Sequence, residues 1–488
     1  MATHENISFS LDKKKVVLVK PSKPTPSEVL SFSTIDNDPN VELICQTIYA
    51  YQENNVIVSS MNGDTTDRVN RNQIIFSNQK DPAAIIEEAL TKVLVYYYPL
   101  AGKLKRQSHD GKLQINCNAD GVPFLVATAD CQLSSLRYLD GIDVETAKKF
   151  VFNYPSDDSN IGYHPLVLQV TKFSCGGFTI GMGLSHAMCD GFGAAQFFRA
   201  LAELASGKSE PTVKPVWERE RLAAKPTEGP FQFPLDLASI ATSPYVPSAD
   251  MAHECFNVNS DSITRLKMSL MKEADHHDQN LDHQTIKESF TTLEVVGAYV
   301  WRSRLRALNL NPDGKTIFSV VVGLRRIFNP PLPDGYYGNA FVSANVVLTV
   351  KDLNESPLSK TVQLIKESKK LSSTNEYVKK ALSDLERMRE LNVKIGGGTG
   401  SMMMLTDWRQ LGVIEEVDFG WKGSVNIIPV PWNMFGYIDL CMFLPPCKLD
   451  PSMKGGVRVL VCLPRAAMAK FKEEMDALKV GQAGAAGA

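Results

Sequence analysis

From residue 166 to residue 193 the chain reads LVLQVTKFSCGGFTIGMGLSHAMCDGFG. It begins with two runs rich in Val, Leu, Ile and Phe, Leu166 to Phe173 and Phe178 to Leu184. These runs flank the turn residues Ser174 to Gly177, and branched or aromatic residues on both sides of a short glycine-containing turn are typical of a β-hairpin. The sequence therefore predicts two antiparallel strands here.

The residues after Gly191 follow a different period. Apolar side chains recur at helical intervals up to Leu204, and Gly207 supplies a helix stop. We therefore expect a buried helix directly after the hairpin. Ser185 to Gly193 is then the corner at which a strand passes into a helix.

Helices and strands are also predicted outside this corner. Asp81 and Pro82 fit the cap and the first position of an amphipathic helix that stops before Pro99. The second half predicts a helix around Thr292 to Arg306, a strand around Ile317 to Val322, two polar-faced helices within Ser359 to Arg389, and short strands up to Leu463.

Between Ser206 and Tyr245 the apolar pattern gives way to a proline-rich segment, which indicates a crossover between two domains. We place the boundary near residue 225, so that residues 1–225 and 226–488 form two domains of similar size. A length of 488 residues is sufficient for two or three cores. Both halves predict helices packed on mixed sheets, which is a mixed α/β (α+β) fold.

Composition and charge exclude several classes of protein. The chain has 52 Lys and Arg against 54 Asp and Glu, so no excess of positive charge favours nucleic acid. No run of about 18 apolar residues occurs, and the first 20 residues do not resemble a signal peptide. We therefore expect a soluble, cytoplasmic protein without membrane contact, and a monomer, since no heptad pattern demands assembly.

The sequence predicts neither a metal site nor a phosphate-binding loop. The nine cysteines are scattered and never at C-x-x-C spacing, so we expect reduced, mostly buried thiols. His276, His277 and His283 match no standard zinc spacing and are expected in a solvated loop. The glycines at 396–400 lack the lysine of a phosphate-binding loop, which predicts a mobile loop.

His186 is the candidate for chemistry, because it leaves a strand end beside flexible glycines and could point into a cleft. An imidazole has the pKa that a general base needs near neutral pH. The alternative is a core histidine bonded to backbone. If the segment were helical, Asp190 could orient His186 as in a catalytic triad. Cys189 could be a nucleophile, although a buried spectator thiol is the simpler interpretation.

Two motifs together resemble the paired signature of the plant BAHD acyltransferases. The first is His186-x-x-x-Asp190-Gly191 and the second is Asp418-Phe419-Gly420-Trp421. Further segments agree, and the resemblance covers nearly the whole chain: Tyr98 to Gly102, Trp217 to Arg221, Pro330 to Asn339, and Thr406 to Arg409. Several of these look most like spermidine hydroxycinnamoyl transferases.

The resemblance implies a chloramphenicol acetyltransferase-like fold with a tunnel between the two domains. It also implies that Asp190 turns away from this tunnel and pairs with an arginine, for which Arg325 is the matching position. The late motif, residues 418–421, is structural in the family. Here Lys422 follows Trp421 where the family ordinarily has glycine, a departure that concerns the loop geometry.

The implied reaction is acyl transfer from a hydroxycinnamoyl-CoA co-substrate to an amine or alcohol, with no metal and no permanently bound cofactor. His186 would be the general base. Thr406 and Trp408 match a family pair that can donate hydrogen bonds to the tetrahedral intermediate. Asp407, between them, is our candidate to bind a distal ammonium of spermidine, since many relatives with hydroxyl acceptors carry a small polar residue there.

Two alternatives stay open at this point. One is an alcohol acceptor, such as shikimate, quinate or an alkaloid hydroxyl, and the other is a non-catalytic acyl-CoA binder. The sequence does not show which hydroxycinnamoyl donor is preferred or how many nitrogens of spermidine are acylated. It also does not identify the residues that bind the CoA phosphates.

Overall fold

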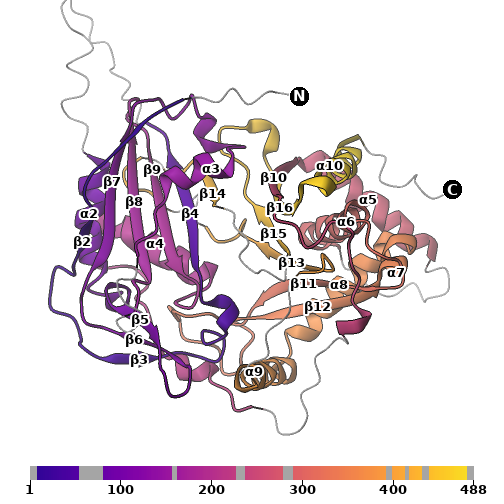
Figure 1. Cartoon of the computed structure of the whole chain (residues 1–488), viewed down its shortest axis with the longest axis horizontal. Coiled ribbons are helices and arrows are strands. Elements are labelled where there is room, and N and C mark those ends of the chain that lie inside the picture. Colours follow the sequence, from indigo (N-terminus) through magenta and orange to yellow (C-terminus); the bar gives the residue numbers. More distant parts are fainter. Residues whose placement is uncertain are drawn as a thin grey trace, which may run out of the picture.

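The computed structural model describes residues 8–53, 81–155, 162–226, 237–277, 289–391, 398–412, 417–421, 423–430 and 439–480. Two large sheets organise the chain (Figure 1). The first half of the sequence, indigo to magenta in the figure, builds most of one sheet, and the second half, orange to yellow, builds the other. The predicted mixed α/β architecture is confirmed.

The first sheet has seven strands in the order β1-β7-β8-β9-β4-β14, with β2 also paired to β7. β7 and β8 run parallel and the other neighbours antiparallel, so the sheet is mixed. Its strands are β1 (Leu11–Lys13), β2 (Val17–Val19), β4 (Ile44–Tyr51), β7 (Val122–Ala129), β8 (Leu166–Phe173), β9 (Phe178–Ser185) and β14 (Asn426–Pro429).

The predicted hairpin is confirmed as β8 and β9, with the second strand one residue longer than expected. Both predicted helices of this half are also confirmed: α2 (Pro82–Val93) is capped by Asp81, and α4 (Gly191–Ala205) is capped by Asp190. The two helices pack on each other and share a core with the sheet.

Both faces of this sheet are covered, as β4 illustrates. Tyr49 and Tyr51 pack into the core that contains α2 and α4, whereas Ile48 and Ala50 pack into a second cluster on the other side. Successive strand residues point to opposite faces, so a strand buried on both sides reads as a continuous apolar run.

The second sheet has six strands in the order β10-β16-β15-β13-β11-β12, with β13 parallel to both of its neighbours. These strands are β10 (Met251–Val258), β11 (Lys315–Gly323), β12 (Phe341–Thr349), β13 (Met402–Asp407), β15 (Asp439–Leu444) and β16 (Val457–Pro464). The helices of this half are α5 (Ser260–His277), α6 (Thr292–Ala307), α7 (Val350–Glu355), α8 (Leu358–Ser372), α9 (Asn375–Glu390) and α10 (Arg465–Val480). The predicted helices and strands of this half are therefore present.

Smaller elements complete the fold. A three-stranded sheet pairs β3 (Val29–Ser31) and β5 (Lys103–Arg106) with β6 (Leu113–Asn116), and α3 (Val144–Ala147) is a single helical turn. Short 3-10 helices span Pro39–Val41, Tyr98–Ala101, Arg137–Leu139, Lys148–Phe150, Arg219–Leu222, Leu237–Ser239 and Pro451–Met453.

The two sheets do not follow the predicted boundary at residue 225 strictly. β14 comes from the second half, yet it pairs antiparallel with β4 at the edge of the first sheet. Val417, Phe419 and Trp421, just before it, pack into the core of the first half. The division into 1–225 and 226–488 stays a prediction, amended by this segment, which returns to the first sheet.

Some of the predictions concern residues for which the structure gives no description or a different one. Lys422, His283, Gly396 and Gly397 lie outside the described residues. His276 and His277 belong to the last turn of α5, so the loop expected there is wrong for these two.

Within the described ranges no group of three or more potential ligand side chains could hold a metal ion. None of the helices in those ranges combines the length and apolar character needed to cross a bilayer.

Candidate active site

His186 is the first residue after β9, and its backbone is fixed by Leu43, the residue before β4. The His186 N–H donates to the carbonyl of Leu43 at 2.8 Å, while Ser185 N–H donates to Pro165 O at 2.7 Å. The imidazole is half-buried and lines a cavity of about 650 Å³. The cavity is lined from both large sheets, with residues of β4 and β9 on one side and of β11, β12, β13 and β15 on the other.

The two ring nitrogens of His186 have different surroundings. Nδ1 is buried and has no hydrogen-bond partner among the described residues. The ring edge packs against Phe341, with 6.1 Å between the ring centroids. Nε2 is thus the nitrogen that can meet a substrate in the cavity. The interpretation of His186 as a core histidine is not supported, because its ring reaches the cavity.

Residues 186–190 form a turn and not a helix. Asp190 has extended backbone angles and caps α4, where its carboxylate accepts a hydrogen bond from Gly193 N at 3.0 Å. The helical spacing that a triad would need is therefore absent. Gly193 is required by this turn, since a Cβ there would lie 2.5 Å from the Cβ of Cys189.

Asp190 pairs with Arg325, the contact that the family resemblance implies. The guanidinium donates two hydrogen bonds to the carboxylate, at 2.7 and 2.8 Å, and Ala340 N donates a third at 3.0 Å. Burial alone would lower the pKa of the Arg325 guanidinium. The negative charge of Asp190 has the opposite effect, and the pKa is held above its ordinary value. Asp190 thus joins the turn to the segment that follows β11, instead of orienting the imidazole.

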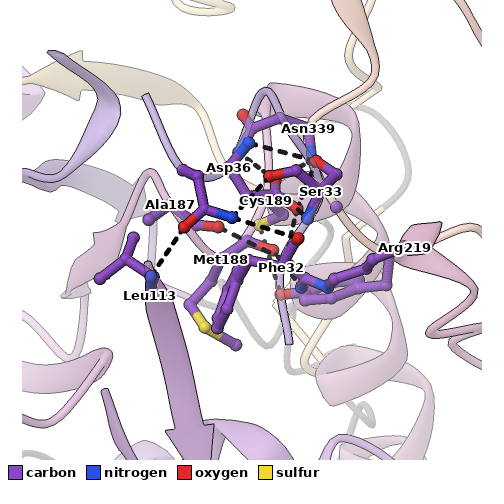
Figure 2. Close-up of polar contacts among 12 residues, drawn as sticks. Phe32, Ser33, Asp36, Leu113, Ala187, Met188, Cys189, Arg219 and Asn339 are labelled. Carbon is purple, nitrogen blue, oxygen red and sulfur yellow. Dashed lines mark hydrogen bonds and ion pairs between the residues drawn. The ribbon is translucent and has the colours of Figure 1, made fainter. Parts of the chain in front are cut away.

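A second network holds the backbone of the turn that begins at His186 (Figure 2). Asn339 Nδ2 donates to the carbonyl of His186 at 2.7 Å, and Arg219 donates to those of Ala187 and Met188 at 3.4 and 2.7 Å. Asp36, fully buried, links the two donors: it accepts from Arg219 at 2.9 Å and from Asn339 Nδ2 at 2.8 Å. Three consecutive carbonyls are therefore fixed by side chains.

Arg219 and Asn339 lie in segments that carry the family resemblance, but this role was not predicted for them, and Asp36 was not predicted at all. Neither residue stands out locally, because Asp36 and Arg219 both lie among other polar and charged residues. Buried charges are seldom tolerated without a partner. The pairing of Asp36 with Arg219 spans 183 positions, so one sequence does not reveal it.

Thr406 and Trp408 both line the cavity that His186 faces. Thr406 belongs to β13, and Trp408 follows directly, with its backbone N–H donating to Phe443 O at 2.8 Å. No described residue is hydrogen-bonded to the Thr406 hydroxyl or to Trp408 Nε1. Both donors are thus available to a ligand, and their role towards an oxyanion stays a prediction.

Asp407 lines the same cavity but is already paired. Its two oxygens accept hydrogen bonds from the Arg409 guanidinium at 2.9 and 2.6 Å. The predicted role of Asp407, an anchor for an ammonium group, takes no account of this arginine. Because the pair has no net charge, it attracts a further cation less than an isolated carboxylate would.

The late motif, residues 418–421, does not line the cavity. Asp418 accepts hydrogen bonds from the backbone of Gly420 at 2.7 Å and of Trp421 at 2.8 Å, which closes a tight turn. Gly420 has φ of +97°, a conformation that costs other residues strain. Phe419 packs edge-on against Tyr51. The motif shapes the core of the first half, which agrees with a structural role.

Cys189 is buried in the cavity wall, beneath the turn. Its thiol donates to the hydroxyl of Tyr337 at 3.4 Å, and burial raises the pKa of the thiol to about 12. A thiolate is the reactive form, so this environment disfavours a nucleophile. The interpretation as a spectator thiol therefore has the better support.

A model of the Transferase family matches residues 71–478 of the chain. The chain belongs to this family, the BAHD acyltransferases. Two Arabidopsis thaliana proteins are similar along almost their whole length. Spermidine coumaroyl-CoA acyltransferase is 44% identical over 473 residues, 96% of this chain and 96% of that protein. Spermidine sinapoyl-CoA acyltransferase is 44% identical over 478 residues, 97% of this chain and 98% of that protein.

Two solved structures share the fold. Vinorine synthase has a TM-score of 0.67 at 20% identity and covers 96% of this chain and 98% of its own. TRI101 of F. sporotrichioides, solved with coenzyme A and T-2, has a TM-score of 0.63 at 17% identity and covers 93% of this chain and 99% of its own. The expected two-domain fold is confirmed, and this BAHD member is an acyl-CoA-dependent acyltransferase.

Proposed function

We propose that this BAHD acyltransferase transfers a hydroxycinnamoyl group from its CoA thioester to the amino groups of spermidine, with His186 as general base. The observation that carries the catalytic part is that His186 lines a cavity formed from both sheets while its Nδ1 is buried, which leaves Nε2 as the nitrogen for a substrate. The acceptor is supported by the 44% identity to two spermidine acyltransferases over nearly the full chain.

The reaction begins when the acceptor nitrogen adds to the thioester carbonyl. His186 Nε2 removes a proton from that nitrogen as the C–N bond forms, a step for which a positioned base typically contributes a factor of about 100 to 10,000. The C–S bond then breaks. The CoA thiolate leaves and takes the proton from the imidazolium, so amide and free CoA are the products.

The tetrahedral intermediate carries a negative oxygen that needs hydrogen-bond donors. The Thr406 hydroxyl and Trp408 Nε1 are our candidates, because both line the cavity and neither has a partner among the described residues. Donors that are already in place need no reorganisation when the charge develops.

A polyamine acceptor must lose a proton before it reacts. A primary ammonium with a pKa of about 10.4 is neutral in roughly one molecule in 2,500 at pH 7. The site should therefore desolvate the reacting nitrogen and bind the remaining ammonium groups at carboxylates. Asp407, in combination with Arg409, stays one candidate for such an anchor.

The proposal is tested by incubating the protein with coumaroyl-, feruloyl- or caffeoyl-CoA and spermidine, and following the products by mass. We expect successive spermidine amides, resolved by their masses, with one CoA released per amide. Shikimate and quinate in the same mixture should compete poorly. Ester products in preference to amides, or CoA release without any amide, would reject spermidine as the acceptor.

A further inference from the structure

Six Asp, His, Lys and Arg side chains line the cavity: Asp38, His186, Asp190, Lys369, Asp407 and Arg409. Most of them have a partner of opposite charge. Asp190 pairs with Arg325, Asp407 pairs with Arg409, and Lys369 Nζ lies 2.8 Å from Glu294 Oε1. Asp38 is the one carboxylate of the cavity wall that has no ion pair among the described residues.

The hydrogen bonds of Asp38 leave half of its carboxylate available. Oδ1 accepts from Asn40 N at 2.9 Å and from Asn40 Nδ2 at 2.7 Å, which caps the short helix Pro39–Val41. No described residue donates to Oδ2. The position is therefore fixed by Oδ1, while Oδ2 can accept a hydrogen bond from a ligand.

The surroundings of Asp38 favour a cationic ligand. Burial raises the pKa of its carboxyl above the usual value, and Asn40, Arg106 and His186 oppose this effect. Arg106 is itself paired with Glu42, so its charge is largely compensated. A carboxylate that has lost water and lacks a counter-ion gains most from binding an ammonium group.

We propose that Asp38 binds an ammonium group of the acceptor in the cavity that His186 faces. This inference rests on the proposed function and adds a specificity residue to it. A triamine keeps two ammonium groups while its third nitrogen reacts, so Asp38 and the Asp407–Arg409 pair can both contact it. Asp38 supplies the stronger attraction, because its charge is not neutralised by an arginine.

The test compares acceptors in the purified full-length protein. We would measure kcat/KM for spermidine and for n-hexylamine, which has no second charge, with coumaroyl-CoA as donor. Asp38→Asn should lower the ratio of the two values by about 10-fold or more, the typical effect of a charge-assisted hydrogen bond, mainly through the KM for spermidine. Asp38→Glu, which keeps the charge, should retain part of the preference.

The matched control is Glu88→Gln, which removes one negative charge from the exposed face of α2 and should leave the ratio unchanged. Melting temperatures verify that each variant is folded. An unchanged ratio in Asp38→Asn, or an equal loss for both amines, would overturn the role of Asp38. If the unaltered protein formed no spermidine amide, the proposed function itself would fail, and the assignment of Asp38 with it.

Discussion

His186 presents a single ring nitrogen to the cavity, because Nδ1 is buried without a partner among the described residues. A general base needs only one accessible nitrogen, provided that the ring cannot turn away from the substrate. Here the backbone on both sides of the ring is fixed, by Leu43 at the N–H and by Asn339 at the carbonyl. These bonds fix the main chain from which the imidazole projects, and the ring itself packs against Phe341. No carboxylate among the described residues is bonded to the ring.

Asp407 requires a test that separates its own charge from that of Arg409. We predict that Asp407→Asn raises the KM for spermidine more than the KM for the thioester. This result alone has two explanations, since the substitution also uncovers a guanidinium that repels a polyamine. The double variant Asp407→Asn with Arg409→Gln removes both charges. If Asp407 anchors the acceptor, the double variant keeps the raised KM in steady-state assays.

A return of the spermidine KM to its original value in the double variant would assign the effect to the uncovered Arg409. Arg409→Gln alone is the complementary variant, because it leaves Asp407 unpaired in the cavity. We expect it to lower the KM for spermidine.

Cys189 lines the cavity beside His186, so its inertness can be measured. With its pKa raised to about 12 by burial, the thiol should stay protonated at every pH from 7 to 9. We predict that Cys189→Ala retains a kcat close to the original, and that iodoacetamide modifies Cys189 much more slowly than it modifies free cysteine at both pH 7 and pH 9. Peptide mass mapping measures the second point. A loss of turnover as large as that of a His186 variant would instead indicate covalent catalysis.

At the level of elements, the start of α4 is a point at which the two halves of the molecule are bonded to each other. Asp190 caps the helix through Gly193 and also binds Arg325, which follows β11 of the other sheet. The Asp190 carboxylate thus fixes the end of the turn that begins at His186 and the first turn of α4, and it ties both to the second sheet through Arg325.

Removing Arg325 should therefore destabilise the fold. We predict that Arg325→Met costs about 3 kcal/mol, since it leaves a mostly buried carboxylate without its counter-ion. Arg326→Met, at the neighbouring exposed arginine, is the matched control and should change the melting temperature little. The double variant Asp190→Asn with Arg325→Met should be more stable than Arg325→Met. Equal melting temperatures for Arg325→Met and the control would contradict the role of the ion pair.

For the whole molecule, the elements that depend on local sequence could be predicted. The hairpin β8–β9 follows from branched residues on both sides of a glycine-containing turn, and α2 follows from Asp81 and Pro82 at its start. The motifs at residues 186–191 and 418–421 identified the family, and this gave the pairing of Asp190 with Arg325.

What the sequence could not reveal depends on contacts between distant residues. β14 has four residues and enters the first sheet only because β4 offers a free edge, more than 370 positions earlier in the chain. Asp36 contacts Asn339 across 303 positions. The Asp407–Arg409 pair is local, but it competes with the ammonium contact that we predict for Asp407, and the sequence does not decide between them.

The central claim is that His186 removes the proton of the acceptor, and the substitution His186→Ala tests it most directly. Amide formation from coumaroyl-CoA and spermidine should be measured by mass for both proteins, together with the melting temperature and the affinity for coumaroyl-CoA. We predict a loss of about 100- to 10,000-fold in kcat, with the other two quantities nearly unchanged. Amide formation at the original rate in the folded variant would contradict the account.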